Sequence, residues 1–258
     1  MSQNTQYTDQ EPKQWRAVKA RTGVRRTTRD QNSGVTQNNS WLGLPRGSCI
    51  LPIDLQRIVD FNRGKTPAKR VALNLLPEPF IGNPCSARVV LLGLNPGHSD
   101  NDHDDQHNRE FREAIRLNLR HKPQAYPFYP LDPRFANTGS GKWWQTHLRP
   151  LVEEAGLNVR TLSERLMVIE WFPYHSARSG LPPQLICESQ KYSFSLAKKL
   201  FRRGLPVIGM RSREHWALAD ERLIRAQYLS NHRRAWISRG NINDEALYEQ
   251  ILTRLIER

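Results

Sequence analysis

The chain has 258 residues, of which 38% are hydrophobic, and a formal net charge of +14 at pH 7. The length and apolar content suffice for one substantial α/β core, and the positive charge favours a polyanionic partner, nucleic acid ahead of an anionic membrane surface. No apolar run approaches the roughly 18 residues of a membrane-spanning helix, and the polar N-terminus is unlike a secretory signal.

The three cysteines, Cys49, Cys85 and Cys187, are scattered along the chain and odd in number. Their spacing matches neither a metal site nor a disulfide framework, and an iron–sulfur cluster would need a fourth cysteine. We therefore expect a protein of the reducing cytoplasm that uses no cofactor and no metal, acts as a monomer and has DNA rather than a membrane as its partner.

Residues 1 to about 45 are rich in Gln, Asn, Thr, Ser and Arg and poor in apolar positions, which predicts a basic, largely disordered arm. Its positive charges would either contact phosphates or keep the chain soluble, and the pattern does not decide between these roles. A globular pattern begins near Trp41, and we assign residues 46–258 to a catalytic domain.

From there on, hydrophobic periodicity predicts alternating strands and helices. In chain order we expect a helix over residues 53–63, a strand over 88–94, a polar loop, a helix over 108–121, an aromatic-rich loop over 123–141, a helix over 142–155, a strand over 166–172, a helix over 188–203, a strand over 205–210, a short helix, a strand over 224–229, a basic turn over 230–241 and a closing helix over 243–257. This alternation predicts a three-layer α/β/α fold with a central, mostly parallel, four-stranded sheet.

Each predicted strand is followed by a segment that carries polar side chains. Residues 93–97 (GLNPG) end a buried run with a proline and two glycines, which hold Asn95 rigidly at the end of its strand. The carboxyl ends of parallel strands meet at one edge of a sheet, where ligands bind. We expect four segments to meet at this rim: residues 93–97, 170–176, 209–211 and 231–236.

Residues 93–97 resemble the water-activating motif of the uracil-DNA glycosylase superfamily, in its mismatch-specific and single-strand-selective branches. Residues 135–144 (FANTGSGKWW) are similar to the stretch with which those branches stack the flipped base, and residues 231–236 (NHRRAW) lie where the family has a second motif, usually His-Pro-Ser or Asn-Pro-Ser. The resemblance covers residues 85–258 in the family's order. It implies a glycosylase-like three-layer fold and a monofunctional DNA glycosylase, which hydrolyses the N-glycosidic bond of a flipped base and leaves an abasic site.

The resemblance also implies roles for individual residues. Asn95 would orient the attacking water, while Asn231 or His232 would steady the departing base or the cationic sugar. For His232 alone, a surface histidine in a basic loop is an equally good interpretation. A chain without a nucleophilic lysine in these motifs should hydrolyse the bond without cutting the strand.

Further residues are expected to hold the DNA. Phe135 is our candidate for the ring that stacks on the flipped base, with Tyr126, Phe128 and Tyr129 as rivals. Trp236 would fill the hole left in the duplex, unless it is a core residue. Five arginines would contact the flanking phosphates: Arg211, Arg213, Arg233, Arg234 and Arg239.

Two positions depart from the strict uracil enzymes. Glu170 stands where the family usually has an asparagine that reads the pyrimidine. A carboxylate repels O4 of uracil but accepts a hydrogen bond from N4 of cytosine, although burial could raise its pKa and let it donate. The alternative is a structural carboxylate paired with an arginine.

The second departure is Gly97, which replaces a tyrosine that blocks substituents at C5 of the base. Because excision of plain cytosine would be lethal to the host, Glu170 and Gly97 together predict a C5-modified cytosine, such as the glucosylated hydroxymethylcytosine of phage DNA. The chain thus resembles a modified-cytosine glycosylase of the anti-phage defence type. A uracil or mismatch repair glycosylase is the closest alternative.

Two other patterns suggest phosphate or metal binding. Residues 138–142 (TGSGK) hint at a P-loop, but Ala136 and Trp143 stand where that motif needs Gly and Ser or Thr, and we reject it. The Asp- and His-rich residues 98–107 could ligate a divalent metal, which would indicate a nuclease, although N-capping and solvated surface explain them better. A non-catalytic DNA-binding relative of the glycosylases also remains open.

Overall fold

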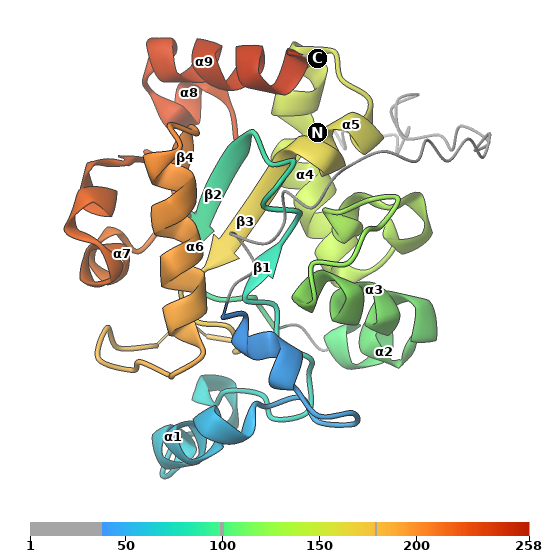
Figure 1. Ribbon diagram of the computed structural model, residues 1–258, viewed down its shortest axis with the longest axis vertical. Helices are drawn as coiled ribbons and strands as arrows, with labels where there is room; N and C mark the ends of the chain where they lie inside the picture. Colours follow the sequence, from blue (N-terminus) through green and yellow to red (C-terminus); the bar gives the residue numbers. More distant parts are fainter. Residues whose placement is uncertain (1–37, 99–100, 179, 258) are drawn as a thin grey trace, which may run out of the picture.

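The computed structural model describes residues 38–98, 101–178 and 180–257 (Figure 1). Most of the predicted basic arm lies outside these ranges. Its last residues do not, and they are folded: Trp41 is buried, and the side-chain amide of Asn39 donates to the Leu119 carbonyl at 2.8 Å. The folded part therefore begins before the predicted boundary at residue 46.

A mixed sheet of five strands forms the centre of the fold. The strands are β1 (Phe80–Ile81), β2 (Val89–Gly93), β3 (Leu166–Glu170), β4 (Val207–Gly209) and β5 (Gln227–Tyr228), in the order β1-β3-β2-β4-β5. Strands β2 to β5 pair with one another in the parallel direction, as predicted, whereas β1 pairs with β3 in the antiparallel direction. Four strands were expected from the sequence and β1 was missed, because its two residues are too few to show a periodic pattern.

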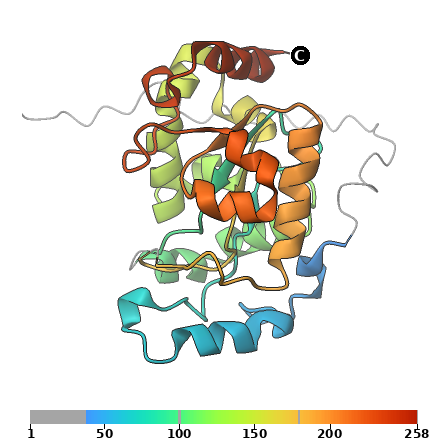
Figure 2. The ribbon, with the colours of Figure 1, turned by 90° about the vertical axis from the view of Figure 1, so that its left-hand side faces the viewer.

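Helices lie on both sides of the sheet, and Figure 2 shows α6 and α4 on opposite sides of the strands. This α/β arrangement is compatible with the predicted three layers. Within the described ranges, no helix has both the length and the apolar character needed to cross a membrane. The α-helices are α1 (Pro52–Asn62), α2 (Asn101–His107), α3 (Arg109–Leu119), α4 (Gly139–Ala155), α5 (Val159–Arg165), α6 (Gln190–Arg202), α7 (Arg213–Ala219), α8 (Arg239–Ile242) and α9 (Glu245–Ile256).

Local capping interactions explain where the major helices begin. Asn108 accepts from the amides of Glu110 and Phe111 at the start of α3, and Asp244 accepts from the Leu247 amide at the start of α9. The predicted helices are confirmed with shifts of a few residues at their ends. Helices α2, α5 and α8 were not predicted, and α2 occupies a stretch expected to be a loop.

Strands β2 and β3 are buried along their full length, and their register sets Gly93 directly opposite Glu170. A β-carbon at position 93 would overlap the carboxyl group of Glu170. Glycine is therefore needed at position 93, because the Glu170 carboxyl group occupies the space that a side chain would fill.

We expect Gly93→Ala to lower the free energy of unfolding by about 1–3 kcal/mol, because the added methyl group displaces a packed side chain. Chemical denaturation measures this loss. Most of it should disappear when Glu170 is also replaced by alanine. Gly43→Ala is the control, because no atom lies within 4 Å of a β-carbon at that position. An undiminished loss in the double variant would contradict the explanation.

Candidate functional site

The carboxyl ends of β2, β3, β4 and β5 lie along one edge of the sheet, as the parallel topology requires. Arg211, after β4, places its Nη2 3.5 Å from the backbone oxygen of Asn95, after β2. A pocket of about 380 Å³ opens at this edge. Its lining comes from the segments after β2, β4 and β5: Leu94, Met210, Arg211, Ser212, Arg213, Tyr228, Leu229 and His232.

Asn95 is held in one orientation at the end of β2. The residue is only 3% exposed, and its Nδ2 donates to the Pro96 carbonyl at 2.7 Å and to Ser176 Oγ at 3.0 Å. A carbonyl oxygen can only accept, so the amide nitrogen must face it. No described residue donates to the amide oxygen of Asn95, which therefore remains an acceptor for a water or a ligand.

A clamp formed by His175 and Ser176 holds the turn around Asn95. Ser176 binds the Asn95 side chain, while the imidazole Nδ1 of His175 lies 2.6 Å from the Gly97 carbonyl and its Nε2 lies 3.0 Å from the Leu76 carbonyl. From the sequence, both residues were assigned to the segment 170–176 at the end of a predicted strand, but no role was predicted for either. Only the fold reveals that they bridge from β3 to the turn after β2.

Glu170 is a buried acid at the end of β3. It is 8% exposed, and its Oε2 has no hydrogen-bond partner among the described residues. Burial raises the pKa of Glu170 to about 7; Arg211 lowers it and Glu78 adds a smaller rise. Both the carboxylate and the carboxylic acid are therefore populated near neutral pH, and the unpaired oxygen is itself buried.

A second buried acid, Glu78, was not predicted. The hydroxyl of Tyr129 donates to its Oε1, and His175 Nε2 lies 3.6 Å from its Oε2. Burial raises the pKa of Glu78 and that of Tyr129. Glu78 comes just before the two-residue strand β1, where no periodic pattern marks it as part of a site.

The candidate stacking rings are mostly packed inside. Phe135 is 1% exposed, with its ring 5.1 Å from that of Phe111, and Phe128 and Tyr129 are also buried. Tyr126 is the one partly exposed ring of the four candidates. The structure thus does not present Phe135 at an open surface beside Asn95.

The second motif forms a turn that is tied together by its own side chains. Asn231 Oδ1 accepts from the Arg234 amide at 3.2 Å, and Asn241 Oδ1 accepts from the Asn231 amide at 2.6 Å. His232, in contrast, lines the pocket. Of the two predicted catalytic residues, His232 is therefore the one that faces the strand ends, while Asn231 shapes the turn.

The predicted DNA-contacting residues divide into two groups. Arg211, Arg233, Arg234 and Trp236 are exposed. Arg239 instead binds Glu154, Glu245 and Glu249 and lies over the ring of Tyr248. Because its charge is neutralised within the protein, Arg239 joins α8 to α4 and α9, and we remove it from the set of phosphate contacts.

The glycine-rich start of α4 has a structural role. Thr138 caps the helix by accepting from the Gly141 amide at 3.0 Å, and Gly141 lets the helix approach the Phe135 carbonyl, which a β-carbon would overlap. Asp105 Oδ2 accepts from the Gly139 amide at 2.6 Å. The described part of residues 98–107 is thus largely helix α2 supporting α4, and the described residues contain no group of three potential metal ligands.

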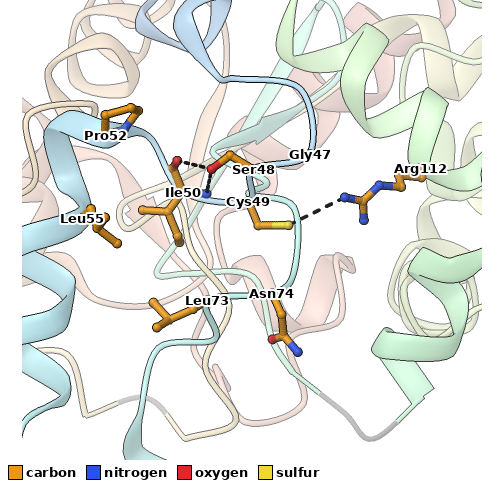
Figure 3. Close-up of a pocket in the computed structure, with 9 residues that line it drawn as sticks. All are labelled: Gly47, Ser48, Cys49, Ile50, Pro52, Leu55, Leu73, Asn74 and Arg112. Atoms are coloured by element: carbon orange, nitrogen blue, oxygen red, sulfur yellow. Dashed lines mark hydrogen bonds between the residues drawn. The ribbon is translucent and has the colours of Figure 1, made fainter.

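A larger hollow of about 490 Å³ lies between α1 and α3 (Figure 3). Apolar side chains such as Leu55 and Leu73 line it, and Arg112 Nη2 lies 3.8 Å from Cys49 Sγ. None of the residues expected to bind DNA or the base contributes to this hollow. Arg211, Arg213 and His232, which the sequence predicted to act on DNA, line the smaller pocket at the sheet edge instead.

Comparison of the chain with protein-family models, with curated proteins and with solved structures gave no match. The assignment of a function therefore depends on the residues and their geometry.

We expect Glu170→Gln to change how stability depends on pH. Because folding raises the pKa of Glu170 from 4.5 to about 7, the unfolded chain loses this proton first as the pH rises. The stability contribution of the acid is therefore full below pH 4.5 and is lost as the pH rises through about 7. The neutral amide lacks this loss, so the variant should gain about 2–3 kcal/mol on the parent between pH 4.5 and pH 8.

Denaturant unfolding at both pH values measures the gain. The matched control is Glu153→Gln, which alters an exposed glutamate of α4. A difference between Glu170→Gln and the parent that does not vary with pH would mean that Glu170 is ionised throughout this range.

We expect Ser176→Ala to lower the free energy of unfolding by about 1 kcal/mol, because Asn95 Nδ2 loses a buried hydrogen-bond acceptor. Solvent exchange of the Asn95 side-chain amide, followed by NMR, should accelerate as well. Ser193→Ala is the control, since the Ser193 hydroxyl is buried and unpaired among the described residues. Equal effects of the two substitutions would contradict a specific clamp.

Proposed function

We propose that this protein is a monofunctional DNA glycosylase of the uracil-DNA glycosylase superfamily, and that a C5-modified cytosine is its base. The observation that carries the proposal is the position of Asn95 and Glu170 at the ends of the neighbouring strands β2 and β3, each with a side-chain oxygen that receives no hydrogen bond from the described residues. The first oxygen suits a water molecule and the second suits the edge of a pyrimidine. Arg211 adds a positive charge close to both groups.

In this proposal Asn95 Oδ1 accepts a hydrogen bond from the attacking water. The water oxygen forms a bond to C1′ of the sugar while the C1′–N bond breaks, and the electron pair of that bond leaves with the base. The water loses one proton and the base anion takes up one proton, so that the products are an abasic sugar with a C1′ hydroxyl and the neutral free base. His232 and Arg211 stabilise the negative charge that develops on the departing base.

Glu170 and Gly97 support a modified cytosine. An ionised Glu170 accepts from the exocyclic amino group of cytosine and repels the O4 atom of uracil. Gly97 is exposed, and no atom lies within 4 Å of where its β-carbon would be, which leaves room for a substituent at C5. The substituent also explains how plain host cytosine would escape.

Mass spectrometry of released bases tests the proposal. The panel contains uracil mismatches, plain cytosine, 5-hydroxymethylcytosine and glucosylated phage DNA, in EDTA and followed by alkali to reveal abasic sites. Release of the glucosylated base alone is the expected result. No release from any substrate would refute a glycosylase and favour a DNA-binding module, or a nuclease if added Mg²⁺ then produced strand breaks.

We expect Asn95→Ala to reduce base release by about 10²-fold or more, because the water loses the acceptor that orients it. DNA affinity, measured by fluorescence anisotropy, should change little. Gln56→Ala serves as the control, because it removes an exposed amide from the distant helix α1. A parallel loss of binding and activity would make Asn95 a structural residue.

The raised pKa of Glu170 also favours one competing substrate. A protonated Glu170 can donate to O4 of uracil and accept from its N3–H, so a uracil glycosylase would need the acid form. Release of uracil should then fall about tenfold per pH unit above about 7. Release of a cytosine derivative should persist there, because the carboxylate still accepts from N4. The pH profile therefore separates the two functions.

A further inference from the structure

Among the described residues, two tryptophans are exposed, and the two chain segments that carry them are hydrogen-bonded to each other. Trp143 of α4 is 40% exposed and Trp236 in the second-motif turn is 43% exposed, whereas Trp41, Trp144, Trp171 and Trp216 are buried. Exposed aromatic side chains that lie close together mark candidate binding surfaces.

Trp143 is held as a rigid platform. Its ring stacks on that of His147 with the centroids 3.9 Å apart and the planes at 21°, and the edge of buried Trp144 packs against it at 4.6 Å. His147 Nδ1 lies 2.6 Å from the Trp143 carbonyl, one helical turn away. His147 therefore covers one face of the indole, and 40% of the Trp143 surface remains exposed.

Trp236 is fixed next to this platform. The Ile237 amide donates to the His147 carbonyl at 3.0 Å, and His147 also has a hydrogen bond with the backbone of Arg234. Figure 2 shows the red second-motif turn beside α4. Asn241 Nδ2 donates to the Trp236 carbonyl at 2.8 Å.

Backbone strain marks the same turn. Ala235 has a φ of 52°, a conformation that an L-residue adopts at a cost of about 1–2 kcal/mol, and both Ala235 and Ile237 are buried. Trp236 is thus exposed between two buried neighbours in the chain. Such a conformation persists only where the surroundings enforce it, as ligand-binding turns often do.

Positively charged residues lie on the same segments of the chain as the two tryptophans. Lys142, Arg149, Arg233 and Arg234 are exposed, and within the described ranges none has a carboxylate within 4 Å. Arg239 shows the opposite behaviour, because it binds three glutamates. Flat aromatic surfaces among free cations are the features that bind single-stranded nucleic acid, through base stacking and phosphate attraction.

We propose that Trp143, His147 and Trp236 form a stacking surface for unpaired bases of DNA, outside the pocket that would take the excised base. His232 lines that pocket and belongs to the same turn as Trp236, so the turn links the pocket to this surface. The inference rests on the proposed function only in taking DNA as the ligand. It predicts a preference for strands with unpaired bases over an intact duplex.

The test measures binding of an unmodified 12-nucleotide thymidine strand and of a blunt duplex of equal length by fluorescence anisotropy. Trp143→Ala and Trp236→Ala should each weaken single-strand binding about tenfold, the loss of one stacked base, and duplex binding less than about twofold. Ile53→Ala, which removes an exposed apolar side chain from α1 at the far end of the molecule, is the control.

Two further measurements keep the proposal testable if an alanine variant folds poorly. The single strand should quench tryptophan emission in the parent protein, and Trp143→Phe should bind the strand within about threefold of the parent while losing part of the quenching. Absence of quenching, equal losses with Ile53→Ala, or dissociation of a dimer by Trp143→Ala in sedimentation would each overturn the proposal. Because the strand carries no excisable base, failure of base release leaves this test unaffected.

Discussion

Burial of the Glu170 carboxyl group at the end of β3 is the constraint around which the site is arranged. The parallel register places Glu170 opposite Gly93, and the missing side chain of Gly93 provides the space that the acid occupies. A buried carboxyl group with an unpaired oxygen is costly in free energy, which explains its raised pKa and the nearby charge of Arg211. This cost is the reason why the proposed function gives Glu170 a role in binding.

The surroundings of Asn95 differ from those of Glu170, because hydrogen bonds fix the orientation of a neutral side chain there. Ser176 and the Pro96 carbonyl take both hydrogen-bonding directions of the amide nitrogen, and His175 holds the turn through Gly97. An amide oriented before the ligand arrives need not lose orientational freedom on binding. The ends of β2 and β3 thus carry one fixed neutral acceptor, Asn95, and one titratable acid, Glu170.

Most of the fold could be predicted from the sequence, because long apolar runs and helical periodicity are local signals. Strands β2 and β3 and helices α3, α4, α6 and α9 lie where the pattern indicated. The short strand β1 could not be found, since its two residues owe their conformation to pairing with β3. Helix α2 was mistaken for a loop because its polar residues show no apolar periodicity, while the fold uses Asp105 to support the start of α4.

The site divides in the same way. The sequence by itself determined that Asn95, Glu170, Arg211 and the second motif follow neighbouring parallel strands, because alternation of strands and helices dictates which ends meet. Only the tertiary structure decided which groups are free. It engaged Arg239 with three glutamates, packed Phe135 into the core, turned His232 rather than Asn231 toward the pocket, and left Trp143 exposed. These outcomes depend on contacts between residues far apart in the chain, which spacing along the sequence does not encode.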